Sequence, residues 1–198
     1  MFFIKLNKIT FAIINNLFYW ISQKVENIYK DYQLLKITKN KSIKIGSGTF
    51  IHVTATIEIV NGGTVKIGNN CQILNGVVLI TYGGNINIGD NCIISPYTII
   101  YGLGGAMICD DVLIAGHTIV VPDNHIFDDI MAPINKQGSK QIGIKINSNV
   151  WIGHGCSILD GVEIESGAII AAGSVVNKNV ASNTIVGGVP IKLIKERN

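Results

Sequence analysis

The chain has 198 residues, of which 15% are charged and 47% are hydrophobic, and its formal net charge is +3. This length suits one domain with a single hydrophobic core plus an appendage. The small, scattered positive charge argues against nucleic-acid binding, and the sequence has no uninterrupted stretch of about 18 apolar residues that would span a membrane.

Residues 1–40 contain the first predicted element, an amphipathic helix. Its aromatic residues and the nearby Lys5, Lys8 and Lys24 leave two interpretations open: a helix that caps the open end of the next domain, or one that binds peripherally to a membrane surface. Asn15 and Asn16 interrupt the apolar run and no small-residue cleavage site follows, so we expect a cytoplasmic protein whose only membrane contact is peripheral, at the inner membrane. Apolar residues at helical spacing are Ile14, Leu17, Ile21, Val25, Ile28, Tyr32 and Leu35.

Residues 41–181 contain a six-residue repeat. From Ile45 onward an aliphatic residue recurs every six positions, a period that fits neither an amphipathic helix nor an isolated strand. Extra residues enter only after every third hexad, which indicates that three hexads make one turn. We therefore predict an all-β fold, a parallel β-helix of about six triangular coils with one long protruding loop. The predicted inward anchors are Ile45, Ile51, Ile57, Ile67, Ile73, Leu79, Ile88, Ile94, Ile100, Ile108, Ile114, Val120, Ile146, Ile152, Ile158, Ile164, Ile170 and Val176.

The interruptions predict outward loops along one edge of the coil. Each of the first three contains a glycine pair, at residues 62–63, 83–84 and 104–105, where the backbone must reverse with positive φ. A small residue four positions after an anchor is expected to point inward too. Three of the four cysteines occupy such positions, and their spacing matches neither a metal site nor a disulfide framework, so we expect buried thiols and no metal. The cysteines are Cys71, Cys92, Cys109 and Cys156.

The fourth interruption, a predicted loop over residues 121–143, is the candidate site of chemistry, because long excursions from a rigid scaffold are often functional. It begins with PDNHIFDD, which places His125 where the chain leaves the coil. A histidine is well suited to take a proton near neutral pH. His117, in the same coil, is either a hydrogen-bonded groove residue or a substrate contact. No GxSxG motif or Walker A loop occurs, which argues against an acyl-enzyme and against a phosphate-cradling loop.

Four motifs together resemble the hexapeptide-repeat acyltransferases, specifically the branch with galactoside, maltose and nodulation-factor acetyltransferases and polysaccharide O-acetyltransferases. The motifs are AGHTIVVPDNHIFDD at 115–129, VWIGHGCSILDGV at 150–162, AIIAAGSVV at 168–176 and VGGVPIKLIK at 186–195. The resemblance covers residues 45 to about 195. It implies a left-handed coil, a homotrimer with active sites between neighbouring subunits, and acetyl-CoA as co-substrate without a metal.

The resemblance also implies roles for the matching residues. His125 removes the proton from an acceptor hydroxyl, which attacks the thioester directly, while a main-chain N–H in the stretch from Trp151 to His154 stabilises the oxyanion. By the same resemblance the acceptor contacts are Ser95, Tyr101, His117 and Asn124, and acetyl-CoA is bound by Trp151, Gly153, His154, Ala171, Ala172, Asn177, Lys178 and, in a CoA-contacting tail over residues 182–198, Lys192 and Lys195.

Two features depart from the family pattern. His154 stands where relatives often carry a small residue, and residues 1–40 do not match the short sugar-binding cap of the galactoside and maltose enzymes. The leading hypothesis is O-acetylation of a sugar hydroxyl in the biosynthesis of a surface polysaccharide such as O-antigen or capsule. A second is N-acetylation of a free or nucleotide-linked amino sugar, because His125 could equally deprotonate an ammonium. A third, a structural β-helix platform, predicts no histidine-bearing insertion.

Overall fold

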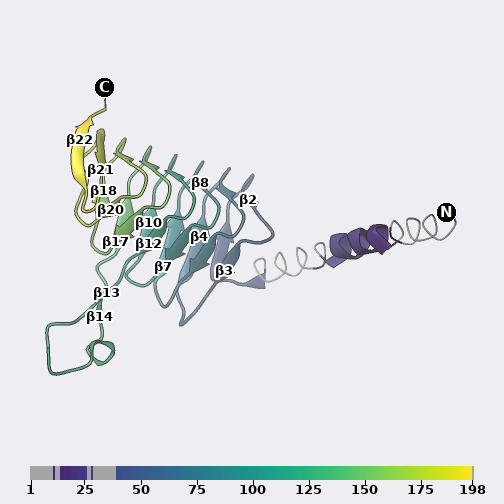
Figure 1. Cartoon of the computed structure of the whole chain (residues 1–198), viewed down its shortest axis with the longest axis horizontal. Coiled ribbons are helices and arrows are strands. Elements are labelled where there is room, and N and C mark those ends of the chain that lie inside the picture. The colour runs from purple at the N-terminus through teal and green to yellow at the C-terminus, as the bar shows by residue number, and fades with distance from the viewer. Residues whose placement is uncertain (1–10, 12–13, 26–27, 29–38, 198) are drawn as a thin grey trace, which may run out of the picture. The chain divides into compact units, whose positions relative to one another are not determined.

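The computed structural model describes residues 11, 14–25, 28 and 39–197. The chain divides into two compact units, Met1–Asn40 and Lys41–Asn198. Figure 1 shows the helix of the first unit and the stacked coils of the second.

The first unit contains a helix over residues 14–25, as the apolar spacing predicts. Its large apolar side chains are exposed, Phe18 at 70% and Trp20 at 55%. Tyr32 and Leu35 of the predicted stripe lie outside the described residues, and the capping role stays a prediction. No helix among the described residues is both long enough and apolar enough to cross a membrane.

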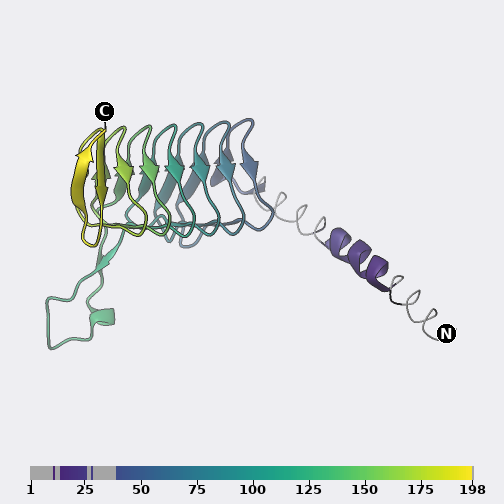
Figure 2. The ribbon, with the colours of Figure 1, turned by 45° about the horizontal axis from the view of Figure 1, so that its top comes forward.

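The second unit is a β-helix whose coils stack three parallel sheets (Figure 2). Sheet A contains β1 (Ile43–Ile45), β4 (Thr64–Ile67), β7 (Asn85–Ile88), β10 (Ala106–Ile108), β15 (Ile144–Ile146) and β18 (Glu163–Ile164). Sheet B contains β2 (Phe50–Ile51), β5 (Gln72–Ile73), β8 (Ile93–Ile94), β11 (Leu113–Ile114), β16 (Trp151–Ile152), β19 (Ile169–Ile170), β21 (Thr184–Gly187) and β22 (Lys192–Glu196). Sheet C contains β3 (Thr56–Glu58), β6 (Val78–Ile80), β9 (Ile99–Tyr101), β12 (Ile119–Val121), β17 (Ser157–Leu159) and β20 (Val175–Val176).

The hexad anchors fill the interior of this coil. In sheet B, Ile94 pairs with Ile73 of the preceding coil and with Ile114 of the following one, so anchors stack on anchors. Every predicted anchor is buried except Ile45 and Ile51, which belong to the first coil. The six-residue period therefore predicted the core correctly, because each inward side chain needs an aliphatic neighbour one coil away.

The three cysteines at predicted inward positions are buried, and the fourth cysteine is not. The thiols of Cys71, Cys92 and Cys156 are buried, and Cys92 Sγ donates a hydrogen bond to the carbonyl oxygen of Cys109 at 3.1 Å. Cys109 itself is only half-buried, because it directly follows the anchor Ile108 and lies outside the inward slot. The expectation of four buried thiols was wrong at this position.

Three edges join the sheets and are named here by the sheets they connect. The AB edge comprises residues 46–49, 68–71, 89–92, 109–112, 147–150 and 165–168, and the BC edge comprises residues 52–55, 74–77, 95–98, 115–118, 153–156 and 171–174. All four interruptions of the hexad pattern lie on the CA edge. Gly83 has φ of 91° there, whereas a Cβ on Gly84 would overlap the carbonyl oxygen of Leu103. In this pair the first glycine allows the backbone to change direction, and the second allows close contact with the next coil.

The C-terminal residues are strands rather than a tail. β21 extends sheet B in parallel with β19, and β22 turns back to pair with β21 in the antiparallel sense. Most of the segment over residues 182–198 is therefore part of sheet B, and its contact with CoA stays a prediction. The hexad period ends at Val176, so the repeat carried no information on the reversal that follows.

Candidate active site

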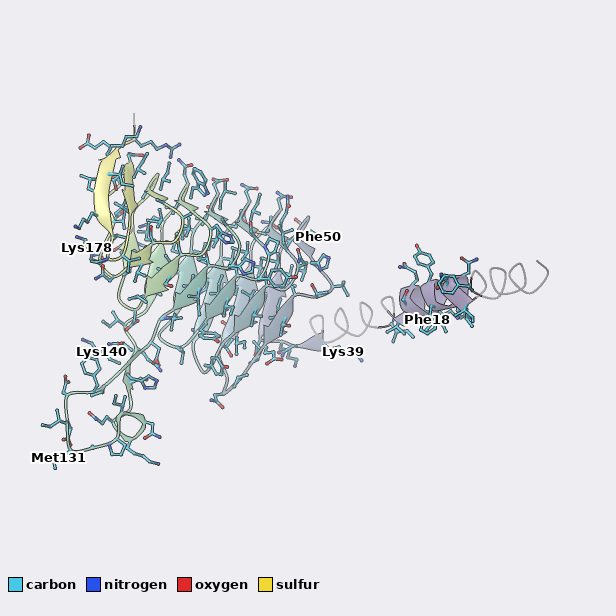
Figure 3. All side chains as sticks on the ribbon, viewed as in Figure 1. Phe18, Lys39, Phe50, Met131, Lys140 and Lys178 are labelled. Carbon is cyan, nitrogen blue, oxygen red and sulfur yellow. The ribbon has the colours of Figure 1, made fainter. Side chains whose placement is uncertain are left out.

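The insertion at the CA edge is a hairpin arm (residues 122–143) that projects from the stacked coils (Figures 1 and 3). β13 (Asn124–His125) pairs with β14 (Ser139–Lys140), and His125 lies opposite Ser139. Beyond them is the 3-10 helix η1 (Ile134–Lys136). Gln137 closes the tip, since its Nε2 donates to the carbonyl oxygens of Asp129 and Ala132, each at 2.9 Å. The arm is therefore an ordered hairpin with His125 near its root.

The root of the arm is held to the next coil by Asp160. The carboxylate of Asp160 accepts hydrogen bonds from the N–H groups of Ile142 at 3.0 Å and Gly143 at 2.8 Å. A hollow of about 270 Å³ lies beside this anchor. It brings together two of the predicted site residues, Asn124 and Asn177, with Asp123, Lys140, Ile142, Leu159 and Asp160.

His125 has an exposed imidazole. In the described part of the chain, no group forms a hydrogen bond with its ring, so both nitrogens are available to a ligand. An unengaged imidazole on a hydrogen-bonded hairpin is able to accept a proton from a bound hydroxyl or ammonium.

The BC edge carries an aromatic ladder formed by Tyr97, His117 and His154. The His117 ring stacks on Tyr97 with centroids 5.2 Å apart, and it meets His154 edge-on, also at 5.2 Å. His117 and Tyr97 both have φ near +60°. Sequence reasoning missed Tyr97, although it stands three residues after the anchor Ile94, as His117 stands three after Ile114. Ser95 is half-buried on the same edge.

The main chain next to this ladder offers a free donor. The N–H groups of Gly153 and Gly155 are used in coil stacking, at 2.8 Å to the carbonyl of Ile170 and 3.0 Å to that of Gly116. Within the described residues, the N–H of His154 donates to no protein acceptor. This is the group predicted to stabilise an oxyanion, and it is available for that role.

The glycines and alanines of the BC edge differ in what surrounds them. A Cβ on Gly153 would lie 2.5 Å from the nitrogen of Ala172, so this glycine is required for coil contact. Above Gly155 and Gly173 nothing lies within 4 Å, which leaves the backbone open to a ligand. Ala171 is half-buried and Ala172 exposed on the same edge.

Trp151 lies on the outer face of sheet B and is 52% exposed. It borders a hollow of about 200 Å³ together with Arg197, whose Nη1 donates to the carbonyl of Gly167 at 3.1 Å. Arg197 was not predicted, because only the strand reversal brings it back to this coil. Lys192 and Lys195 are exposed on β22, where they pair with Gly187 and Ile185.

A larger hollow, of about 400 Å³, lies on sheet A and contains none of the predicted site residues. Lys145 Nζ meets Glu163 Oε1 there at 2.7 Å. The hydrogen bond from Lys145, with a second from Asn147, holds the pKa of the Glu163 carboxyl below its ordinary value, and the pKa of Lys145 is raised in return. The pair links two coils on an exposed face and is explained by stacking alone.

The predicted site residues therefore fall into separate groups within one chain. His125, Asn124, Asn177 and Lys178 lie at the CA edge, where Tyr101 also meets Tyr82 with ring centroids 5.2 Å apart. The free N–H of His154 lies at the BC edge. β12 of sheet C runs between the two edges, and its length with the flanking residues corresponds to roughly 13 Å. One chain alone does not bring His125 to the His154 amide.

The chain is similar to known bacterial acyltransferases. Residues 143–178 match the family model described as bacterial transferase hexapeptide (six repeats). The putative lipopolysaccharide biosynthesis O-acetyl transferase WbbJ of Escherichia coli is 30% identical over 109 residues, which cover 52% of this chain and 56% of that protein. Galactoside O-acetyltransferase of E. coli is 36% identical over 92 residues, covering 46% of this chain and 44% of the relative. The chain thus matches about half the length of these relatives.

Solved structures extend the likeness over most of the coil. AntD, an N-acyltransferase from Bacillus cereus in complex with dTDP and 3-hydroxybutyryl-CoA, has a TM-score of 0.70 and 26% identity, over 85% of this chain and 88% of that one. Residues 143–178 thus carry the bacterial transferase hexapeptide repeat, and the coil of three parallel sheets with its hexad core is similar to that of hexapeptide-repeat acyltransferases.

Proposed function

We propose that this protein transfers an acetyl group from acetyl-CoA to a hydroxyl of a saccharide, in the biosynthesis of a surface polysaccharide such as O-antigen or capsule. The observation that carries the proposal is the unengaged imidazole of His125 on an ordered arm at the point where the hexad pattern is broken. The O-acetyltransferase relatives support a hydroxyl acceptor.

In this proposal His125 accepts the proton of the acceptor hydroxyl as its oxygen attacks the thioester carbonyl carbon. The N–H of His154 donates to the carbonyl oxygen as negative charge develops there. The carbon–sulfur bond then breaks, and the proton held by His125 is passed to the departing thiolate. The proton is returned and no metal is required by these steps.

The BC edge fits the pantetheine arm of acetyl-CoA. The bare backbone at Gly155 and Gly173 leaves space for a thin chain, and the free N–H of His154 lies beside it. The hollow at Trp151 and the exposed Lys192 and Lys195 supply an apolar wall and positive charge on the adjoining sheet.

A homotrimer would complete the site. The outward side chains of sheet C are mostly aliphatic, and Glu58 is the only charged one among its strands. Three copies that turn this face toward a threefold axis would each place the CA edge of one copy against the BC edge of the next. His125 of one subunit would then approach the His154 amide of its neighbour, which the single chain does not achieve.

N-acylation of an amino sugar is the second candidate. It is favoured by the fold similarity to AntD, an N-acyltransferase, over most of both chains. Both reactions need the same base and the same donor to the oxyanion. They differ only in whether the acceptor group is a hydroxyl or an amine. A purely structural β-helix would make acetyl-CoA irrelevant to the protein.

The test uses labelled acetyl-CoA with a panel of sugars, amino sugars and lipid-linked glycans. We expect the wild-type protein to label a hydroxyl acceptor, and His125→Ala to lower turnover by about 10²–10⁴-fold. Acetyl-CoA should still raise the melting temperature of His125→Ala, because the cofactor groove is intact. Near-native turnover of the variant would remove His125 from the mechanism, and labelling confined to amines would select the second candidate.

A further inference from the structure

The helix over residues 14–25 has a continuous apolar face. At 3.6 residues per turn, the side chains of Leu17, Ile21, Ile14, Val25 and Phe18 fall within an arc of about 100°. All five are exposed, from 44% for Ile21 to 70% for Phe18. A face of this size on a helix is one that another surface normally covers.

The rest of the helix is mostly polar, and Lys24 is its one charged residue. Asn15, Asn16, Ser22 and Gln23 lie away from the apolar face. Lys24 and Trp20 border it, and Lys24 Nζ lies 4.3 Å from the centroid of the Trp20 ring. An indole and a lysine at the boundary of an apolar face suit the interface between lipid tails and headgroups, because each has an apolar body and a polar end.

The charge of the N-terminal segment indicates what kind of surface the apolar face binds. The sequence of the first 40 residues contains six lysines against two acidic residues, Glu26 and Asp31, which gives this segment a net charge of +4. The excess of positive charge attracts this segment to anionic surfaces. Because its apolar side chains share one face and its polar side chains the other, the helix would lie in the plane of the surface.

From the arc, its boundary residues and the net positive charge of the segment, we propose that the helix over residues 14–25 binds an anionic lipid surface through its Leu17–Ile21–Phe18 face. If the proposed function holds, this attachment makes lipid-carried saccharides the acceptor class that the arm reaches. The attachment itself does not depend on the transferase activity.

Flotation of the full chain with vesicles, without acetyl-CoA, tests the proposal. We expect binding to vesicles of phosphatidylcholine mixed with phosphatidylglycerol, weaker binding to phosphatidylcholine alone, and weakening by added salt. Phe18→Glu should reduce the bound fraction by about tenfold or more, because it places a charge in the buried face. Gln23→Glu makes the same charge change on the polar face and should bind nearly as wild type.

Two results would overturn the proposal. One is failure of the wild-type chain to float with anionic vesicles, and the other is an equal loss of binding in Phe18→Glu and Gln23→Glu. The alternative is that the apolar face packs against another protein surface, and light scattering of both variants tests it. If Phe18→Glu changes the oligomeric state and leaves vesicle binding unchanged, the face packs against protein and the lipid proposal is wrong. Acetyl transfer to a soluble acceptor is measured separately, so failure of the lipid proposal and failure of the proposed function are distinguishable.

Discussion

The histidines at the two edges differ in how they are held. His117 has φ of 58°, a conformation that costs a non-glycine residue about 1–2 kcal/mol, and its exposed ring contacts the rings of Tyr97 and His154. His125 stands on the arm, and among the described residues its ring forms neither a hydrogen bond nor a contact with another ring. A ring that is packed in a ladder is suited to shaping a surface, whereas a ring without partners is suited to proton transfer.

At the same scale, Cys92 provides a pH-dependent prediction. Burial raises the pKa of its thiol from the ordinary 9.0 to about 12. The unfolded chain therefore ionises first as the pH rises, so the contribution of Cys92 to stability is complete below pH 9 and is lost between pH 9 and about 12. Urea unfolding near pH 8 and near pH 10.5 should show the stability advantage of wild type over Cys92→Ala shrinking at the higher pH. If the stability advantage of wild type is the same at both pH values, the thiol ionises as readily in the folded protein as in the unfolded chain.

At the scale of the element, coil stacking decides which glycines of the BC edge tolerate a side chain. Gly153→Ala should lower the free energy of unfolding by about 1–3 kcal/mol, because its Cβ would meet the backbone of Ala172. Gly155→Asn is the matched control, because there is open space above Gly155 and asparagine tolerates its φ of 67°, as Asn91 does at 57°. Denaturant unfolding of both variants measures the difference, and equal losses would show that the coils can separate at Gly153.

Some features of the arm could be predicted from the sequence and others could not. Its presence and the position of His125 follow from the break in the hexad period, since twenty extra residues cannot be absorbed into the coil. The pairing of β13 with β14 and the anchoring by Asp160 were not predicted. The two strands have only two residues each, too few for a period to appear.

At the scale of the whole molecule, the outward face of sheet C leads to a test of assembly. If the protein is the proposed homotrimer, Ile119→Lys on this face should convert it to monomers and lower acetyl transfer, because the two halves of each proposed site then no longer meet. Met107→Lys makes the same kind of change on the outer face of sheet A, where Met107 is 47% exposed, and should leave the assembly intact. Light scattering combined with the acetylation assay measures both. A wild-type protein that is active as a monomer would contradict the split site.

The sequence by itself determined the coil, its core and the location of the arm. The six-residue period places an aliphatic anchor against the anchors of the adjacent coils, and the break in this period locates the arm. The Tyr97–His117–His154 ladder, the return of Arg197 to Trp151 and the separation of His125 from the His154 amide were decided by the tertiary structure. These contacts join residues from different coils or from the reversed C-terminal strand. Their register depends on the lengths of the insertions and on where the chain turns back, which a local period does not encode.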